Sequence, residues 1–137
     1  MKRFFYIIIA ILFSASSLNA QTTSGKDFWL TFGNNMYLST ISVDLQIRIV
    51  GGDQPTSGDI YFTNLDTYVH FDILAQQVFT YSLNNTEKQA VYNDVQGTSN
   101  RSIHITTIEH SVTVYALNQS SLTMDATNVL PIAALGT

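Results

Sequence analysis

Apolar residues recur at every second position along much of the chain. The longest such run covers residues 41–49, where Ile41, Val43, Leu45, Ile47 and Ile49 alternate with Ser, Asp, Gln and Arg. A period of two is typical of a β-strand that has one face on a core. A shift of one residue in its register would turn all five aliphatic side chains toward water, so we expect this strand in the middle of a sheet with one face solvated.

Shorter segments with the same alternation follow one another and are separated by turn-forming residues. They cover residues 27–32, 60–63, 68–73, 78–83, 102–107, 111–119 and 123–130. The connection 108–111 has the length of a tight hairpin, so the segments on either side of it are expected to pair as antiparallel neighbours. Pro131 should end the last strand, because proline has no N–H to donate to a neighbouring strand.

Two polar segments are predicted to be loops. Residues 51–59 form the longest turn-forming run and are expected to be a solvated hairpin loop. Residues 84–100 are poorly periodic, so we expect a loop with one short edge strand around Val91. Eight or nine short strands between turns, without a helical pattern longer than two turns, predict an all-β fold, an antiparallel two-sheet β-sandwich. A partly open barrel is the alternative fold.

The N-terminal segment has the three parts of a signal peptide. Lys2 and Arg3 precede an apolar run over residues 4–13, and Ala20 supplies the small residue that a signal peptidase requires. We therefore expect residues 1–20 to be a signal peptide, residues 21–137 to be a single domain, and the mature protein to be secreted or held at the cell surface. A retained anchor is disfavoured, because spanning a bilayer takes about 20 apolar residues.

Removal of the signal peptide changes the charge balance. Without Lys2 and Arg3, four basic residues remain against ten acidic ones, which gives a formal charge of −6. Binding to phosphate backbones requires a basic face, so nucleic acid is excluded as a partner. The chain has no cysteine, so packing and strand pairing must hold the exported domain together without disulfides.

Aromatic residues give two alternative interpretations. Trp29, the only tryptophan, is either a platform for a sugar or peptide or a filler in the core or between the sheets, and a strand that also carries Phe28 and Phe32 favours the filler. A carbohydrate-binding domain would need exposed aromatic side chains on one face. The tyrosine candidates for such a face are Tyr61, Tyr68, Tyr81 and Tyr115.

His70 and Asp72 are the nearest approach to a catalytic pair. Both lie on the polar face of the segment 68–73, where a base and its orienting carboxylate would be found. No nucleophile or metal site accompanies them, so we interpret them as a surface pair rather than as catalytic residues. The sequence therefore predicts no enzyme.

No metal or cofactor site is predicted either. His104 and His110 are separated by five residues across a turn without Cys or Glu ligands in zinc spacing, so together with His70 they are interpreted as polar-face and turn histidines. Asp53 and Asp59 lie in a flexible run that could supply oxygens to calcium. Their spacing matches no EF-hand, so calcium binding is the weaker interpretation.

Three motifs carry a family resemblance. Along the chain they are GKDFWLTF, then IHITTIEHSVTVYALN, then MDATNVLPIAALG. This is the order expected for the N-terminal domain of the IgGFc-binding protein family, and the chain resembles bacterial secreted members of that family over residues 24–137. Family members continue past the LG at residues 135–136. The resemblance therefore implies a sheet that is incomplete at its C-terminal edge, with an LPIAALG strand that lacks one neighbour and invites self-association.

Three functions from different classes fit these observations. The favoured one is a non-catalytic recognition or adhesion module that binds an extracellular protein or glycoprotein through loops 51–59 and 84–100 at one end of the sandwich. The second is a carbohydrate-binding accessory domain of a secreted enzyme. The third is a purely structural segment of a larger surface protein, which would bind no small ligand.

Overall fold

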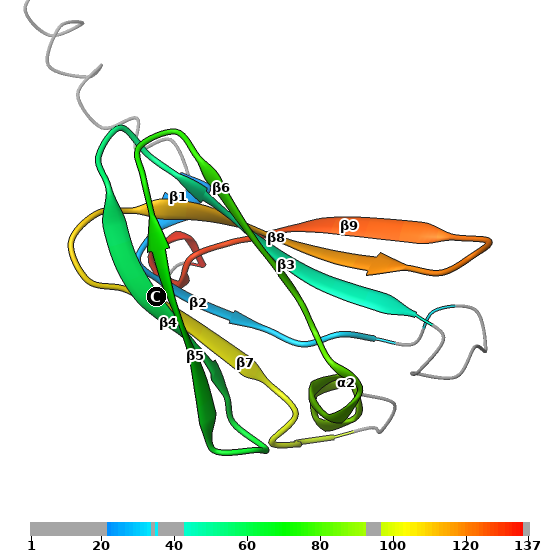
Figure 1. Ribbon diagram of the computed structural model, residues 1–137. Coiled ribbons are helices and arrows are strands. Elements are labelled where there is room, and N and C mark those ends of the chain that lie inside the picture. Colours follow the sequence, from blue (N-terminus) through cyan, green and yellow to red (C-terminus); the bar gives the residue numbers. More distant parts are fainter. Residues whose placement is uncertain (1–21, 34, 36–42, 93–96, 136–137) are drawn as a thin grey trace, which may run out of the picture.

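Two antiparallel sheets face each other in the protein (Figure 1). The computed structural model describes residues 22–33, 35, 43–92 and 97–135, so the predicted signal peptide at residues 1–20 lies outside the described residues. The arrangement confirms the predicted all-β fold and its two-sheet β-sandwich.

One sheet has five strands and the other has four. The five-stranded sheet has the order β1-β8-β3-β6, with β9 also paired to β8, and consists of β1 Ser24–Gly25, β3 Asp44–Gly51, β6 Val78–Ser82, β8 Val112–Gln119 and β9 Met124–Val129. The four-stranded sheet has the order β2-β7-β4-β5 and consists of β2 Asp27–Leu30, β4 Thr56–Phe62, β5 Thr67–Ile73 and β7 Ile103–Thr107. Two short helices, α2 Asn85–Val91 and the 3-10 helix η3 Ile132–Ala134, complete the described elements.

The strand predicted from the longest alternation occupies the interior of the five-stranded sheet. β3 lies between β8 and β6 and pairs with β8 along its whole length. Leu45, Ile47 and Ile49 are fully buried, whereas Arg48 on the opposite face is exposed. The prediction of a central strand with one wet face is confirmed.

The core lies between the two sheets and draws on both. Its fully buried aliphatic and aromatic side chains include Phe28, Ile60, Phe62, Ile103 and Ile105 from the four-stranded sheet and Leu45, Ile47, Ile49, Val112 and Val114 from the five-stranded sheet. Burial of one such side chain contributes about 1.5–3 kcal/mol. This packing stabilises a chain that has no cysteine to form a disulfide.

The predicted hairpin on either side of residues 108–111 is wrong. β7 belongs to the four-stranded sheet and β8 to the five-stranded sheet, so the connection crosses from one sheet to the other. The apolar faces of the two strands, represented by Ile105 and Val114, are buried against the shared core from opposite sides. The crossing is held by Thr56, whose Oγ1 accepts hydrogen bonds from the backbone N–H groups of Glu109 and His110 at 3.4 and 3.2 Å.

The hairpin loop predicted over residues 51–59 is also wrong in extent and kind. β4 begins at Thr56, and the remaining connection from β3 to β4 leads from the five-stranded sheet to the four-stranded sheet. Gly58 was predicted to belong to a turn, but it lies inside strand β4. A Cβ atom at Gly58 would overlap the carbonyl oxygen of Thr106 on β7 and contact the ring of Phe71 at 2.7 Å, so the close approach of β4 to β7 requires glycine.

The segment 84–100 contains a helix where a loop was predicted. Asn84 caps α2, because its side chain accepts hydrogen bonds from the backbone N–H groups of Thr86 and Glu87, and the Glu87 carboxylate accepts one from the N–H of Asn84. The buried Glu87 carboxylate also accepts the hydroxyl proton of Tyr81 at 2.7 Å. Burial, together with this hydrogen bond, raises the pKa of Tyr81 to about 12.

The two segments predicted to form one binding end lie at opposite ends of the sandwich (Figure 1). In the antiparallel pair of β3 and β6, Val50 lies opposite Val78 and Gln46 lies opposite Ser82. The connection after β3 therefore leaves from one end, and α2 follows β6 at the other end. The expectation that both segments form a single loop-lined site is wrong.

The predicted LPIAALG strand is wrong, and the strand edge nearest to this motif in the sequence is that of β9. Residues 132–134 of that motif form η3, and Pro131 forms an isolated bridge with Phe28 on β2. Pro131 ends the preceding strand as predicted. β9 is hydrogen-bonded to β8, and no other described strand pairs with it.

Candidate functional site

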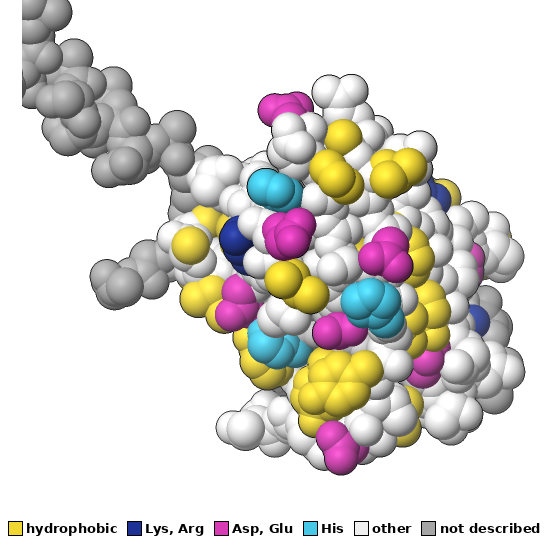
Figure 2. All heavy atoms as spheres, turned by 60° about the vertical axis from the view of Figure 1, so that its left-hand side comes forward, with side chains coloured by type: hydrophobic (Ala, Val, Ile, Leu, Met, Phe, Trp, Pro, Cys, Tyr) yellow, Lys and Arg dark blue, Asp and Glu magenta, His cyan; other side chains and the backbone are white. Residues whose placement is uncertain are grey.

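An aromatic row crosses the outer face of the four-stranded sheet. The strand registers place Trp29 opposite His104, His104 opposite Tyr61, and Tyr61 opposite Tyr68. Neighbouring strands are about 4.8 Å apart, so the row extends over about 14 Å. Hydrophobic, acidic and histidine side chains lie interspersed on the face of the molecule shown in Figure 2.

The rings of the aromatic row stack in pairs. The ring centroids of Trp29 and His104 are 4.1 Å apart with an interplanar angle of 12°, and those of Tyr61 and Tyr68 are 4.5 Å apart at 26°. Stacking across neighbouring strands covers the ring faces that meet. Trp29 and Tyr68 lie at the two ends of the row, on edge strands β2 and β5, so each has a stacking partner on one side only.

Trp29 is exposed, which corrects its interpretation as a filler between the sheets. It is 47% exposed, whereas the preceding residue Phe28 is fully buried. Successive residues of a strand point to opposite faces, so Phe28 takes the core position and Trp29 the outer one. The alternation predicted these opposite faces correctly, but the aromatic character of Trp29 suggested burial.

His104, on the neighbouring strand β7, fixes the position of the Trp29 ring by stacking on one of its faces. Nε2 of His104 lies 2.8 Å from Oδ1 of Asp27, and with its proton on Nε2 the imidazole donates a hydrogen bond to that carboxylate. Asp27 and Trp29 lie on the same face of β2, two residues apart. The indole is thus stacked on a ring that is itself held by a side chain of the same strand.

A cleft opens beside Trp29 at the edge of β2. It has a volume of about 310 Å³ and lies between β2 and the strands β8 and β9. Trp29 and Phe32 contribute aromatic lining, while Asn118, Asp125 and Thr127 contribute amide, carboxylate and hydroxyl groups. An apolar surface with a few polar groups around it is the usual composition of a small-ligand site.

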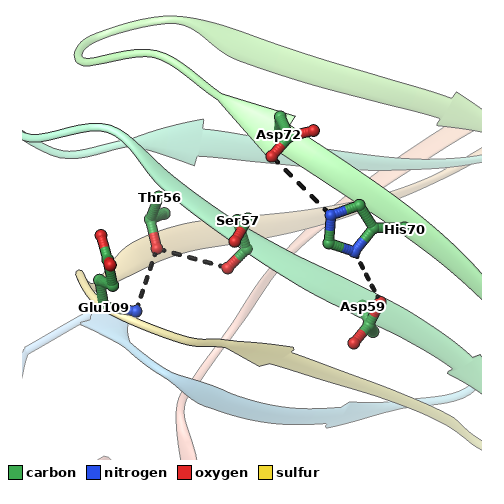
Figure 3. A network of polar contacts seen from close by, with 6 residues as sticks. All are labelled: Thr56, Ser57, Asp59, His70, Asp72 and Glu109. Atoms are coloured by element: carbon green, nitrogen blue, oxygen red, sulfur yellow. Dashed lines mark hydrogen bonds and ion pairs between the residues drawn. The ribbon is translucent and has the colours of Figure 1, made fainter.

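A second group of polar side chains lies beside the aromatic row on β4 and β5 (Figure 3). His70 Nδ1 is 2.9 Å from Oδ1 of Asp59, and His70 Nε2 is 3.8 Å from Oδ1 of Asp72. His70 and Asp72 share a face as predicted, but Asp59, the nearer carboxylate, was assigned to a loop. The hydrogen bond to Asp59 raises the pKa of His70, and the negative charges of both aspartates act in the same direction.

The His70 cluster provides no catalytic arrangement among the described residues. The neighbouring hydroxyl groups shown in Figure 3 belong to Thr56 and Ser57, and Thr56 is occupied with backbone groups on the connection to β8. All three members of the cluster are exposed or half-buried rather than enclosed in a cleft. The cluster is therefore a solvated pair of carboxylates around one imidazole.

We expect the substitution Asp59→Asn to lower the pKa of His70 toward its ordinary value of about 6.5. Because the folded-state pKa is raised, protonated His70 stabilises the fold below its unfolded-state pKa, and this contribution is lost as pH rises through the folded-state pKa. The variant should therefore show a weaker pH dependence of stability in that window. NMR titration of the His70 ring proton measures the shift directly.

Asp72→Asn is the matched control for this titration. Asp72 lies farther from the imidazole than Asp59, so its substitution should lower the pKa of His70 by less. An unchanged titration of His70 in the Asp59→Asn variant would contradict the assignment of Asp59 as the main cause.

The remaining sequence candidates do not join the aromatic row. His110 lies on the connection from β7 to β8, where its carbonyl oxygen accepts a hydrogen bond from Thr107 Oγ1. Tyr81 faces the core region, and Tyr115 lies on the outer face of the other sheet, 39% exposed. Asp53 is exposed on the connection after β3. Within the described ranges, no three His, Asp or Glu side chains converge to hold a metal ion.

Comparisons with known proteins add little to this picture. No family model matches the chain. No curated protein matches it. A structure described as "Crystal Structure of Thermotoga maritima 1070" is similar over 77% of this chain and 92% of its own, with 15% identity and a TM-score of 0.44. In the part of the chain that the structure describes, no helix is long and apolar enough to cross a membrane.

Proposed function

We propose that the protein is a non-catalytic recognition module that binds the glycan part of an extracellular macromolecular partner at the Trp29 cleft. The observation that carries the proposal is the exposed Trp29 ring, stacked on His104 and bordered by a cleft with hydroxyl, amide and carboxylate groups. The resemblance to the IgGFc-binding family, an export signal and a surface-exposed location belong to the same proposal.

The chemistry of the cleft favours a sugar. A pyranose ring has an apolar face of C–H groups and a rim of hydroxyls, so it fits an aromatic side chain that lies beside polar groups. Asp125 can accept hydrogen bonds from sugar hydroxyls, and the hydroxyl of Thr127 can both donate and accept them. Trp29 is already stacked on His104, which Asp27 holds in place, so little side-chain entropy is lost on binding.

The sheet-edge site replaces the loop site expected from the sequence. The connection after β3 and the segment containing α2 lie at opposite ends of the sandwich, so they do not form one loop-lined site. On the outer face of the four-stranded sheet, strand pairing places Trp29 and Tyr61 beside His104, although the three residues are far apart in the sequence.

Titration of the purified protein with neutral oligosaccharides tests the proposal. Trp29 is the only tryptophan, so its fluorescence reports on the cleft without interference. We expect one class among chito-, cello-, manno- and galacto-oligosaccharides to change this fluorescence saturably. The substitution Trp29→Ala removes this fluorescence, so the affinity of the variant is measured by calorimetry. It should weaken binding at least tenfold, which corresponds to a loss of about 1.4 kcal/mol.

Tyr115→Ala provides the matched control. It removes a part-exposed aromatic ring from the outer face of the other sheet and should leave oligosaccharide affinity unchanged. The proposal fails if no oligosaccharide binds, or if Trp29→Ala binds as well as the unsubstituted protein. The purely structural alternative predicts the first of these outcomes.

A further inference from the structure

β9 offers an unpaired strand edge in the described part of the chain. β8 pairs with β3 along one edge, so β1 at Val112–Thr113 and β9 at Val114–Gln119 must share its other edge. Five of the six residues of β9 are exposed. The sequence MDATNV contains no Lys or Pro, the residues that commonly protect an exposed edge.

We propose that β9 pairs edge to edge with β9 of a second copy of this chain. The two strands run antiparallel, so that the five-stranded sheets of the two copies form one continuous sheet. The occupant is a second copy because the sequence of β9 complements itself in a register centred on Ala126.

The backbone of β9 permits this register. The N–H of Ser120 donates to the carbonyl oxygen of Thr123 at 2.8 Å, so Thr123 faces β8. Alternation along an antiparallel strand then turns the backbone groups of Met124, Ala126 and Asn128 toward the free edge. In the register centred on Ala126, that residue bonds to its own copy, and Met124 bonds to Asn128 of the second copy.

The side chains of β9 are compatible with the same register. Asp125 lies opposite Thr127 of the second copy, where a hydroxyl can donate to the carboxylate, and no two like charges face each other. The small side chain of Ala126 at the centre allows the backbones to approach. Met124, which is 59% exposed, lies beside Asn128 of the second copy, so the pairing covers part of its side chain.

The symmetry of the pair places both clefts on the same side. The twofold axis that relates two antiparallel strands is perpendicular to their sheet, so both four-stranded sheets lie on one face of the continuous sheet. Asp125 and Thr127 line the cleft and lie on the strand that pairs, so the two clefts flank the axis. A paired molecule would thus present two binding sites to one surface. This bivalency rests on the proposed function, whereas the pairing of the strands does not.

Cysteine cross-linking tests the register. The chain has no native cysteine. In a hydrogen-bonded antiparallel pair the Cα atoms are about 5.5 Å apart, within disulfide range, so Ala126→Cys should form a covalent dimer under mild oxidation. Met124→Cys is the control, because its equivalent in the second copy is displaced by four residues, about 14 Å. Cross-linking of both variants at equal rates, or of neither, would overturn the proposal.

Sedimentation and binding to a glycan-coated surface separate the pairing from the function. The unsubstituted domain should show concentration-dependent dimerisation that Ala126→Lys abolishes, because two ammonium groups would meet at the axis, whereas Thr80→Lys on exposed β6 should not affect it. Ala126 lies outside the lining of the Trp29 cleft, so Ala126→Lys should keep the affinity for a soluble oligosaccharide and lose the avidity for the surface.

Each outcome of these measurements supports or overturns one proposal. A domain that stays monomeric at all concentrations overturns the self-pairing, including the case in which a strand from a different protein occupies β9. A domain that dimerises but binds no oligosaccharide leaves the pairing intact and overturns the glycan site together with its bivalency.

Discussion

Replacement of Phe28 by alanine should lower the free energy of unfolding by about 3–5 kcal/mol, the usual cost of removing a buried phenylalanine. Phe28 is fully buried although it lies on β2, an edge strand. It also forms a bridge with Pro131, two residues after the end of β9 in the opposite sheet. Its loss would leave a cavity at the point where the two sheets are joined beside the cleft.

Trp29→Ala is the matched control for Phe28→Ala, since it removes an aromatic ring from the adjacent position on the exposed face. It should cost much less stability, although it removes the stack with His104. Urea unfolding followed by far-UV circular dichroism suits both variants, because the signal does not depend on tryptophan. Equal destabilisation of the two variants would show that Trp29 contributes to the core as much as Phe28.

Gly58→Ala is expected to destabilise the protein by about 2–3 kcal/mol, a cost typical of overpacking in a dense interior. The added Cβ would overlap the carbonyl oxygen of Thr106 and contact the Phe71 ring. β7 is fixed between β2 and β4 and cannot move aside without disturbing both pairings. The added methyl group therefore meets a backbone that has little freedom to adjust.

Gly33→Ala serves as the control for this substitution, because nothing lies within 4 Å of a Cβ atom at Gly33. Both changes reduce backbone freedom in the unfolded chain equally, so the difference between them isolates the steric effect. Thermal unfolding of the two variants measures it. A Gly58→Ala variant as stable as Gly33→Ala would mean that β4 and β7 can separate at low cost.

Local alternation was sufficient to predict most of the strands and the class of fold, although the first half of β4 was predicted to be a loop. Side-chain period is a property of each strand alone, so the buried set Leu45, Ile47 and Ile49 could be identified without knowledge of its partners. The partners themselves could not. The short connection 108–111 fits a hairpin and a crossing between sheets equally well, and only the burial of both apolar faces in one core selects the crossing.

The helix and the site were missed for different reasons. Helix α2 has only seven residues, too few for a clear helical periodicity. Its sequence signal is the capping pair Asn84 and Glu87. The aromatic row has no sequence signature, because Trp29, His104, Tyr61 and Tyr68 come from four strands and meet only through register. Chemistry assembled across a sheet is visible only after the pairing is known.

The pairing of β2 with β7 and of β1 with β8 also determines when the domain can fold. Asp27 lies opposite Thr106, and Gly25 lies opposite Val112, so β1 and β2 wait for partners that are distant in the sequence and are synthesised later. Closing such long loops before any contact rewards them slows folding to the millisecond-to-second range typical of all-β domains. Until β7 and β8 are available, β1 and β2 have no strand to pair with, so they are among the last strands to be fixed in the two sheets.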